Sequence, residues 1–559
     1  MFIPTTMKEV KEQGWESLDV ILVTGDAYID SPFTGIAVIG KVLLDKGYRV
    51  GIISQPETGS DKDITRLGRP SLFWGISGGA IDSMVANYTA SRKRRQRDDY
   101  TPGGVNDRRP DRAVIAYTNL VKRYFKSSVP VVIGGIEASL RRISHYDFWS
   151  NKIRRSVLFD AKADYLVFGM GEKAVVALAD KLKQHRDVTD INGIGYISSK
   201  KITPSVELPS FEEVSADKQK FTESFNLFYE NNDAVTAQRI IQKHGNRYLV
   251  LNPVPHPLST EELDYVYGLG FERAVHPYDQ KKGPVKALIT IQASIPAHRG
   301  CYGQCNFCAI SVHEGTTVTW RSEESILKEA ASLSAMKGFK GIIHDIGGPT
   351  ANMYGFECKK KLAKGICRDK RCLFPDVCKN LKPDHSSQIS LLEKLTKIEG
   401  IKKVFIGSGI RHDMIFNDKK NGLKYLSRIV ANHVSGQMKL APEHCRKRVL
   451  RLMGKPGTTS LLAFRNIFHT LSKKIGKDQF LTYYLIAAHP GCTRSDMNRL
   501  KQFTREELKI NPRQVQIFTP TPSTYSTLMY YTEKDPFTGE GVFVEKSLKA
   551  RERQKKILI

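Results

Sequence analysis

The 559-residue chain lacks the long hydrophobic runs that membrane-spanning helices require. None of its apolar runs reaches the ~18 residues needed to cross a bilayer. Its first 15 residues, MFIPTTMKEVKEQGW, also lack the apolar segment of a secretory signal. We therefore expect a cytoplasmic protein that has no membrane partner.

Acidic residues are few relative to basic ones. The 86 Lys and Arg against 58 Asp and Glu give a net charge of +28. Such an excess points to a polyanionic partner, with nucleic acid as the first candidate. However, the basic residues are scattered, and their densest run lies in a basic loop over 91–112. An ordinary solvated surface explains a scattered excess equally well.

Cysteine is scarce outside one region. The chain has nine cysteines, an odd number, and no export signal, which argues against a disulfide framework. Seven of the nine lie between Cys301 and Cys378, as expected of metal ligands. Intrinsic disorder over most of the chain is excluded, because 40% of the residues are hydrophobic and can form the cores of two to four domains.

The first 200 residues alternate short apolar runs with amphipathic stretches. We predict a helix over 35–46, and strands over 18–24, 48–54, 72–77, 129–133 and 165–168. This order indicates an α/β, Rossmann-like parallel sheet, whose strands have carboxyl ends that are the usual place for a ligand. Gly-Asp or Gly-Gly pairs occur at three of those ends, although they could serve only as tight turns.

Residues 201–283 are predicted to be a helical and extended linker between domains. Alternation resumes over 284–535, with strands predicted over 287–292, 341–344, 403–406, 436–440, 482–487 and 514–518. Roughly six β/α units fit a partial or full (β/α) barrel, in which the loops at the carboxyl ends of the strands carry the chemistry. A basic tail, 536–559, ends the chain.

Three thiols follow the predicted strand over 287–292. Cys301, Cys305 and Cys308 have C-x3-C-x2-C spacing. Three thiolates are one short of a closed zinc site, and they suit a four-iron cluster with one open iron. A zinc knuckle or unrelated thiols are the alternatives.

With Phe307 before its third cysteine, this motif resembles the signature of the radical S-adenosylmethionine (SAM) superfamily. The resemblance narrows to the YgiQ-type proteins through GGPTANMY at 347–354, KLAPEH at 439–444 and AHPG at 488–491, and it covers nearly the whole chain. It implies that a [4Fe–4S] cluster and SAM form a 5′-deoxyadenosyl radical, which abstracts hydrogen from a substrate that the likeness does not name. A small reductant protein, such as flavodoxin or ferredoxin, would supply the electron.

The resemblance also implies roles for individual residues. Those expected to contact SAM or the substrate are Phe307, Gly347, Gly348, Ser408, Arg411, Lys439 and Glu443. Among them, Arg411 could pair with the methionyl carboxylate, because a guanidinium fits a carboxylate bidentately. The alternatives are a radical SAM enzyme that modifies RNA, and a non-catalytic, metal-stabilised nucleic-acid-binding protein.

A second group of thiols lies in a lysine-rich insertion over 356–385. Cys358, Cys367, Cys372 and Cys378 could hold zinc or a second iron–sulfur cluster, with His385 as a substitute ligand. An insertion so charged can bury little apolar surface, and a metal would supply its folding energy. Free or redox-active thiols are the alternative.

The first domain weakly resembles the corrinoid-binding domains that precede many radical SAM barrels. It lacks the D-x-H-x-x-G pattern that ligates cobalt, since Gly25-Asp26-Ala27-Tyr28 contains no histidine. We therefore do not expect a corrinoid with histidine on its cobalt, and expect a structural or substrate-binding domain. Corrinoid binding without a lower ligand is the alternative.

Overall fold

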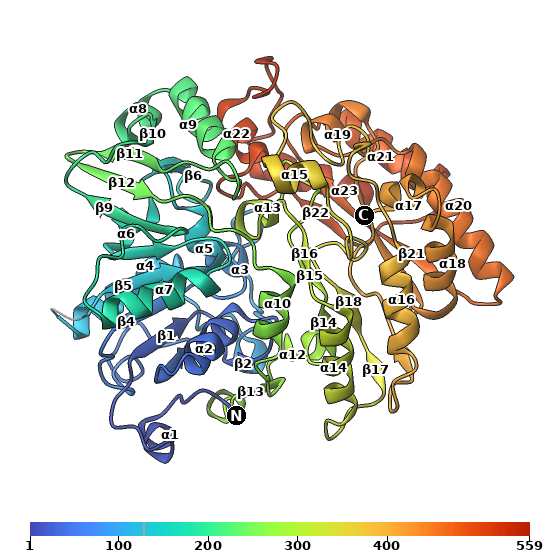
Figure 1. Cartoon of the computed structure of the whole chain (residues 1–559). Helices are drawn as coiled ribbons and strands as arrows, with labels where there is room; N and C mark the ends of the chain where they lie inside the picture. The colour runs from blue at the N-terminus through green and yellow to red at the C-terminus, as the bar shows by residue number, and fades with distance from the viewer. Residues whose placement is uncertain (127–128) are drawn as a thin grey trace. The chain divides into compact units, whose positions relative to one another are not determined.

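The chain folds into two compact units (Figure 1). The structure, a computed structural model, describes residues 1–126 and 129–559. Unit 1 comprises Met1–His256 and Tyr265–Gln292, and unit 2 comprises Pro257–Asp264 and Ala293–Ile559.

Unit 1 is built on a nine-stranded sheet, which confirms the predicted α/β fold with a large parallel sheet. Its parallel part has the order β3-β1-β4-β5-β8. These strands are β1 (Val20–Thr24), β3 (Val50–Ser54), β4 (Phe73–Ser77), β5 (Val131–Gly134) and β8 (Tyr165–Val167). Nearly all of their residues are buried, as expected of a parallel sheet covered on both faces.

Helices cover both faces of this sheet. Helices α2 (Gly35–Asp45) and α7 (Glu172–Lys183) pack together over one face of the sheet, and the Phe73 side chain lies in the core on that face. The next residue, Trp74, points to the opposite face, where its ring lies 4.9 Å from that of Phe125 at the end of α4 (Ala113–Tyr124). Alternation along one strand thus places α2 and α4 on opposite faces.

The sheet continues into the segment expected to be a linker. Residues 202–251 contain the expected helices, α8 (Phe211–Ala216) and α9 (Lys218–Glu230). They also form β10 (Val206–Leu208), β11 (Ile240–His244) and β12 (Arg247–Leu251), which extend the sheet beyond β9 (Ile194–Ser198). The hairpin β11–β12 turns at Gly245, which has a φ of 61°. Apolar runs on both sides of this glycine are the signal of a hairpin.

The basic loop over 91–112 is partly buried. The Arg109 guanidinium is fully buried and pairs with Asp26 at 2.7 Å and with Asp98 at 2.9 Å. Arg142 is also buried, and its guanidinium lies 4.5 Å from the centre of the Phe228 ring. Part of the basic excess therefore stabilises the interior of unit 1.

Parallel strands follow one another in chain order through unit 2. β14 (Ser294–Pro296) pairs with β18 (Asp345–Gly347), and β17 (Ile342–Ile343) pairs with β19 (Lys403–Val404). A bridge from Ile410 to Leu440 leads to β20 (Gln437–Glu443), and β21 (Phe480–Ala487) and β22 (Val515–Ile517) come next. Closure of this run into a full barrel stays a prediction.

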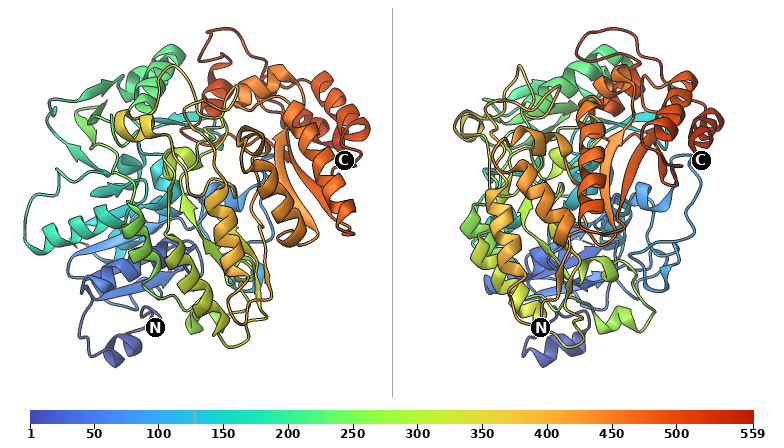
Figure 2. Two further views of the ribbon diagram at one scale, coloured as in Figure 1. Left: turned by 45° about the vertical axis from the view of Figure 1, so that its right-hand side comes forward. Right: turned by 90° about the vertical axis from the view of Figure 1, so that its right-hand side faces the viewer.

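An apolar core joins these strands to four helices. They are α14 (Glu323–Ser334), α16 (Ser386–Leu395), α18 (Gly422–Asn432) and α20 (Thr459–Lys474), and neighbouring members pack on one another (Figures 1 and 2). In β20, Met438 and Leu440 enter this core and alternate with Lys439 and Ala441. The face of the strands away from these helices is therefore the one that carries Lys439.

The strand expected over 287–292 is a helix instead. Leu288–Ile291 forms α12, and the Gln292 amide donates to the Leu288 carbonyl at 2.8 Å. The first strand of unit 2 begins later, at Ser294. Periodicity cannot separate so short an apolar run into helix or strand, and here the local hydrogen bonds decide.

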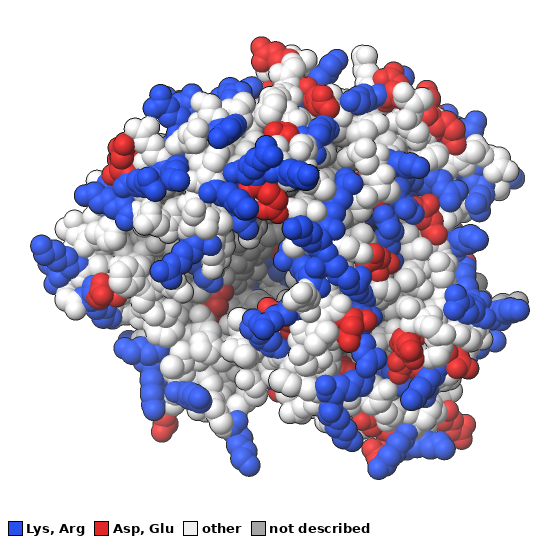
Figure 3. All heavy atoms as spheres, turned by 180° about the vertical axis from the view of Figure 1, so that it is seen from behind, with Lys and Arg blue, Asp and Glu red and all other residues white. Residues whose placement is uncertain are grey.

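The basic tail ends in a packed helix, α23 (Leu548–Leu558), which is capped by the Ser547 side chain and contacts α21 (Arg494–Glu506). No helix in the described part of the chain is long and apolar enough to span a membrane. On the face shown in Figure 3, Lys and Arg are dispersed, with Asp and Glu between them.

Candidate functional site

The cysteine motif occupies a tight loop in unit 2, directly after β15 (His298–Arg299). A Cβ at Gly303 would lie 3.2 Å from the Cys301 Sγ, 3.6 Å from the Cys305 Sγ and 3.8 Å from an Arg411 Nη1. The loop therefore gathers two thiols and the guanidinium around one glycine. Gly300, with a φ of 81°, lies against the Thr317 carbonyl and leaves no room for a side chain.

Neighbouring thiols affect the ionisation of Cys301 and Cys308. Burial raises the pKa of Cys301, and the neighbouring Cys305 raises it further. Burial likewise raises the pKa of Cys308, with added contributions from Cys305 and Cys301. Arg411 acts in the opposite direction on Cys301. Binding of a metal to such thiols must displace their protons.

Asn306 anchors the loop. Its Nδ2 donates to the Leu452 carbonyl at 2.9 Å, and its backbone amide donates to Met453 at 2.9 Å. Both partners lie in α19 (Lys447–Met453). On its other side, Asn306 accepts a 2.7 Å hydrogen bond from Arg371 of the cysteine-rich insertion. The loop is thus held in place from two directions.

The glycine pair after β18 lies against the same loop. A Cβ at Gly348 would approach the His298 carbonyl oxygen to 2.6 Å, so only glycine fits there. The Thr350 Oγ1 is 3.8 Å from the Cys301 Sγ. A Cβ at Gly347 would lie 3.5 Å from the Ser408 Oγ. The structure therefore brings Gly347, Gly348 and Ser408 to the cysteine side of the strands.

Asp345 fixes the loop that carries Ser408. Its carboxylate accepts hydrogen bonds from the Gly407 amide at 2.7 Å, from the Ser408 amide at 3.1 Å and from the Ser408 hydroxyl. Sequence reasoning missed Asp345, although a carboxylate directly after the strand predicted over 341–344 is a recognisable signal.

Arg411 already has a carboxylate partner in the chain. Its Nε donates to Asp413 at 2.9 Å, and its Nη2 donates to the second oxygen of that carboxylate. Burial acts to lower the pKa of Arg411, but Asp413 more than compensates and the pKa is raised. The backbone of Arg411 is held by the Asn352 side chain, through its amide at 2.9 Å and its carbonyl at 3.0 Å. Asp413 and Asn352 were also missed, although Asn352 lies within the motif at 347–354.

Glu443 ends β20 beside a small pocket. The Glu443 side chain is buried and the residue has a φ of +65°. The register of pairing between β20 and β21 shifts between Leu440 and Glu443. Burial raises the pKa of Glu443, against the opposing effect of Lys455, whose Nζ lies 3.9 Å away. A buried acid in a left-handed conformation is a marker of function.

The pocket next to Glu443 is lined by its two chain neighbours, Pro442 and His444, and by Arg411, His412 and Lys455. Burial lowers the pKa of His412 and of His444 to about 4, so both imidazoles are neutral at pH 7. Arg411 is paired with Asp413, and the Lys455 Nζ lies 3.9 Å from Glu443, so the pocket offers hydrogen-bonding groups more than unpaired positive charge.

The remaining predicted residues are more peripheral. Lys439 is half-buried, and its carbonyl accepts a 3.2 Å hydrogen bond from the Ile410 amide. Phe307 packs in a core with Val449 and Leu450, and its ring centre is 6.3 Å from that of His489. Burial lowers the pKa of His489 to about 3, which leaves the imidazole neutral at pH 7.

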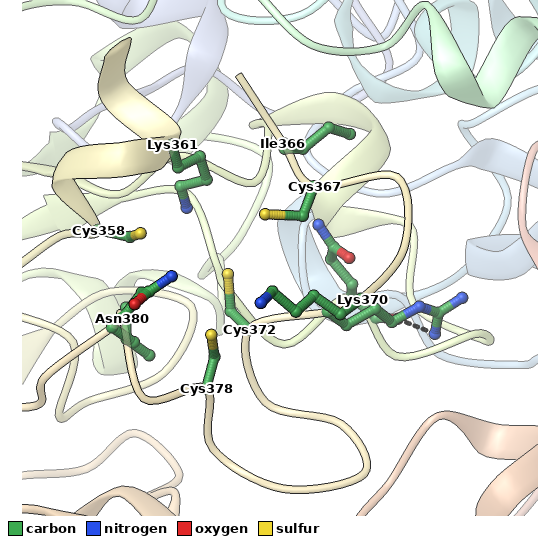
Figure 4. A pocket seen from close by; sticks show the side chains of 11 residues that line it. Cys358, Lys361, Ile366, Cys367, Lys370, Cys372, Cys378 and Asn380 are labelled. Carbon is green, nitrogen blue, oxygen red and sulfur yellow. Dashed lines mark hydrogen bonds between the residues drawn. The ribbon is translucent and has the colours of Figure 1, made fainter. Parts of the chain in front are cut away.

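The four cysteines of the insertion line a second pocket in unit 2, apart from the Glu443 pocket (Figure 4). In the described residues, no three His, Cys, Asp or Glu side chains are arranged to hold a single metal ion. His385 is not among the residues lining the cysteine pocket; its Nδ1 contacts Asp418 at 2.8 Å.

Two solved enzyme structures are similar in fold. A cobalamin-dependent SAM radical enzyme, OxsB, with aqua-cobalamin bound, has a TM-score of 0.50 at 14% identity, over 94% of this chain and 57% of its own. The radical SAM methyltransferase TsrM of Kitasatospora setae, with cobalamin and a [4Fe–4S] cluster bound, has a TM-score of 0.48 at 15% identity, over 91% of this chain and 77% of its own.

Sequence relatives match almost end to end. A UPF0313 protein of Fusobacterium nucleatum is 54% identical, over 100% of this chain and 98% of its own length. A UPF0313 protein of Thermotoga maritima is 51% identical, over 99% and 98%, and one of Methanocella arvoryzae is 45% identical, over 99% and 92%. The family model described as "Radical SAM N-terminal" matches residues 2–294. The chain therefore belongs to the UPF0313 family of radical SAM proteins.

Proposed function

We propose that the chain is a radical SAM enzyme in which Cys301, Cys305 and Cys308 hold a [4Fe–4S] cluster that binds SAM at its open iron. One observation carries the proposal: the loop after β15 brings Cys301, Cys305 and Arg411 together around Gly303. The donor set fits, since three thiolates and no fourth cysteine in the loop leave one iron available.

When bound, the cluster and SAM would supply the electron transfer that breaks the S–C5′ bond and yields the 5′-deoxyadenosyl radical. The chain's own residues would position these groups. Arg411 would offset the negative charge of the thiolates, because its Nη1 faces Gly303 while Asp413 holds its other edge. A small reductant protein, such as flavodoxin or ferredoxin, would provide the electron.

The pocket beside Glu443 would accept a polar part of SAM or of the substrate. Its lining includes Arg411, Lys455 and the imidazoles of His412 and His444, which can hydrogen-bond to a carboxylate or hydroxyl group there. Gly347 and Ser408 lie on the cysteine side of the strands of unit 2, and Gly348 packs against His298.

Unit 1 would serve as a structural or substrate-binding domain. The loops after β1 and β4 touch, since a Cβ at Gly25 would lie 2.2 Å from the Gly78 carbonyl oxygen. The solved structure of OxsB holds aqua-cobalamin. For this chain, the absence of a corrinoid stays a prediction that rests on the missing histidine after Asp26.

The experiment is reductive cleavage of SAM by the full chain. Protein reconstituted anaerobically with iron and sulfide should convert SAM to 5′-deoxyadenosine when dithionite is added. The variants Cys301→Ala, Cys305→Ala and Cys308→Ala should each lower the yield more than about 100-fold, because a cluster lacking one thiolate does not present its open iron correctly. The product is measured by liquid chromatography with mass detection.

Cys445→Ala is the matched control. Cys445 is also partly buried, but it packs in the core with Val449 and Met497. This variant should cleave SAM like the unmodified chain. Undiminished cleavage in any of the three loop variants would refute the assignment, as would absence of 5′-deoxyadenosine from the fully reconstituted chain.

A further inference from the structure

Four thiols converge on one hollow in unit 2, apart from the SAM site proposed above. The hollow is lined by Cys358, Cys367, Cys372 and Cys378. In Figure 4 the four sulfur atoms point from different stretches of chain toward the same central space. Cys358 precedes α15 (Lys359–Lys364), and the other three lie in the irregular segment that follows.

That irregular segment is held by side-chain contacts, since Arg371 donates to the Gln304 carbonyl and to Asn306, and the His385 Nδ1 contacts Asp418. Between the end of α15 and the start of α16 at Ser386, the described chain forms neither helix nor strand. Leu373 and Leu381 are its buried hydrophobic anchors. A 21-residue stretch from 365 to 385 without regular structure is unusual inside a folded unit. A metal crosslink would supply the missing folding energy.

The surroundings of the hollow suit a cluster of thiolates. Lys361, Lys370 and Arg371 are among its lining residues, and Lys361 and Lys370 reach into it in Figure 4. Lys361 is 3% exposed, with its Nζ 2.8 Å from Glu357. Four thiolates bound to a divalent metal carry a net negative charge. The lysine and arginine side chains that line the hollow would offset part of that charge.

The hollow is also joined to the first cysteine loop. Gln304, next to Cys305, is one of its lining residues. Arg371 donates to the Gln304 carbonyl at 3.0 Å, and Cys301, Cys358 and Cys372 contact one apolar cluster around Tyr302. A group bound in the hollow would brace the loop that carries Cys301 and Cys305.

We infer that Cys358, Cys367, Cys372 and Cys378 form a second metal centre, a four-thiolate site for Zn²⁺ or a [4Fe–4S] cluster. The thiols line the hollow without closing on one point. A zinc ion, with Zn–S bonds of about 2.3 Å, would therefore draw them inward, whereas a cluster, which spreads its ligands over four corners, requires less movement.

The test uses the full chain with its first site removed. The variant Cys301→Ala/Cys305→Ala/Cys308→Ala is purified anaerobically, and metal and sulfide are counted per chain. We expect it to retain one zinc, or about four irons with matching sulfide and visible absorbance. Adding Cys367→Ala and Cys372→Ala should lower that content more than about tenfold. Adding Cys445→Ala instead should leave it unchanged.

Zinc and iron–sulfur are separated by the same measurement, and either supports the centre. No retained metal in the folded variant, or equal metal after the Cys367 and Cys372 substitutions, would overturn it. Neither result depends on SAM cleavage, which tests the first site alone.

A second measurement avoids substitutions altogether. In the unmodified chain, alkylation at Cys367, Cys372 and Cys378, all partly exposed, should rise at least about fivefold when a chelator removes the metal. Cys445 should alkylate equally before and after. Alkylation at the three thiols that is already complete without the chelator would contradict the inference.

Discussion

The pKa of a buried carboxyl group in this protein depends on its charged partners. Arg411 and Asp413 neutralise each other beside the cysteine loop, and Asp413 has its pKa lowered by Arg411 despite burial. At Glu443 the nearest charged partner is Lys455 at 3.9 Å, and burial dominates, so the pKa is raised. A buried carboxyl group thus acts as a fixed counter-charge at Asp413 and as a proton-holding group at Glu443.

Asp26 gives a prediction about pH. Burial raises the pKa of this carboxyl to about 6 from its ordinary 3.8, although Arg109 opposes the shift. The folded chain therefore binds more protons than the unfolded chain between about pH 4 and pH 6, and the free energy of unfolding falls as pH rises through that window. Relative to Asp26→Asn, the loss should reach up to about 3 kcal/mol.

Denaturant unfolding at several pH values measures this difference. Tryptophan fluorescence reports mainly on unit 1, because three of the four tryptophans, Trp15, Trp74 and Trp149, lie in that unit. The fourth, Trp320, lies in unit 2. The prediction is wrong if the free energy of unfolding has the same pH dependence in the unmodified chain and in the Asp26→Asn variant.

Among the elements, α23 links the chain terminus to the strand ends of unit 2. The Gln554 Oε1 accepts the Ala488 amide at 3.1 Å, and its Nε2 donates to the Cys492 carbonyl at 3.3 Å. Ala488 follows β21 directly and has a φ of +57°. One side chain from the last helix therefore fixes the loop after β21.

Gln554→Ala should lower the free energy of unfolding by about 1–3 kcal/mol, because it leaves a buried amide and a buried carbonyl without partners. Lys556→Ala, at an exposed position on the same helix, should have almost no effect. Both are compared by thermal unfolding and by protease resistance of the C-terminal segment. Equal stability of the two variants would exclude this role for the helix.

At the scale of the whole molecule the net charge is +28, and on the face shown in Figure 3 basic side chains lie dispersed among acidic ones. Several arginines are buried, including Arg109, Arg142, Arg321 and Arg551, so the composition overstates the basic character of the surface. The nucleic-acid alternative therefore rests on the basic side chains that stay at the surface.

We accordingly expect weak, non-specific RNA binding. Raising the salt concentration from about 50 to about 200 mM should weaken the affinity of the full chain for a random single-stranded RNA more than about tenfold. Lys93→Ala, in the exposed part of the basic loop, should change that affinity less than about twofold. A large loss from this one substitution, measured by filter binding, would instead reveal a localised RNA site.

The sequence by itself determined the α/β class, most strands, the three-cysteine motif and the family. These features are local: apolar runs, glycine turns and thiol spacing are readable without knowing what packs against them. The tertiary structure decided what depends on distant partners. It added β10–β12 to the sheet, and it buried Arg109 between Asp26 and Asp98. It also gave Arg411 its partner Asp413, and turned four widely spaced cysteines toward one hollow, because these placements follow from how chain segments pack.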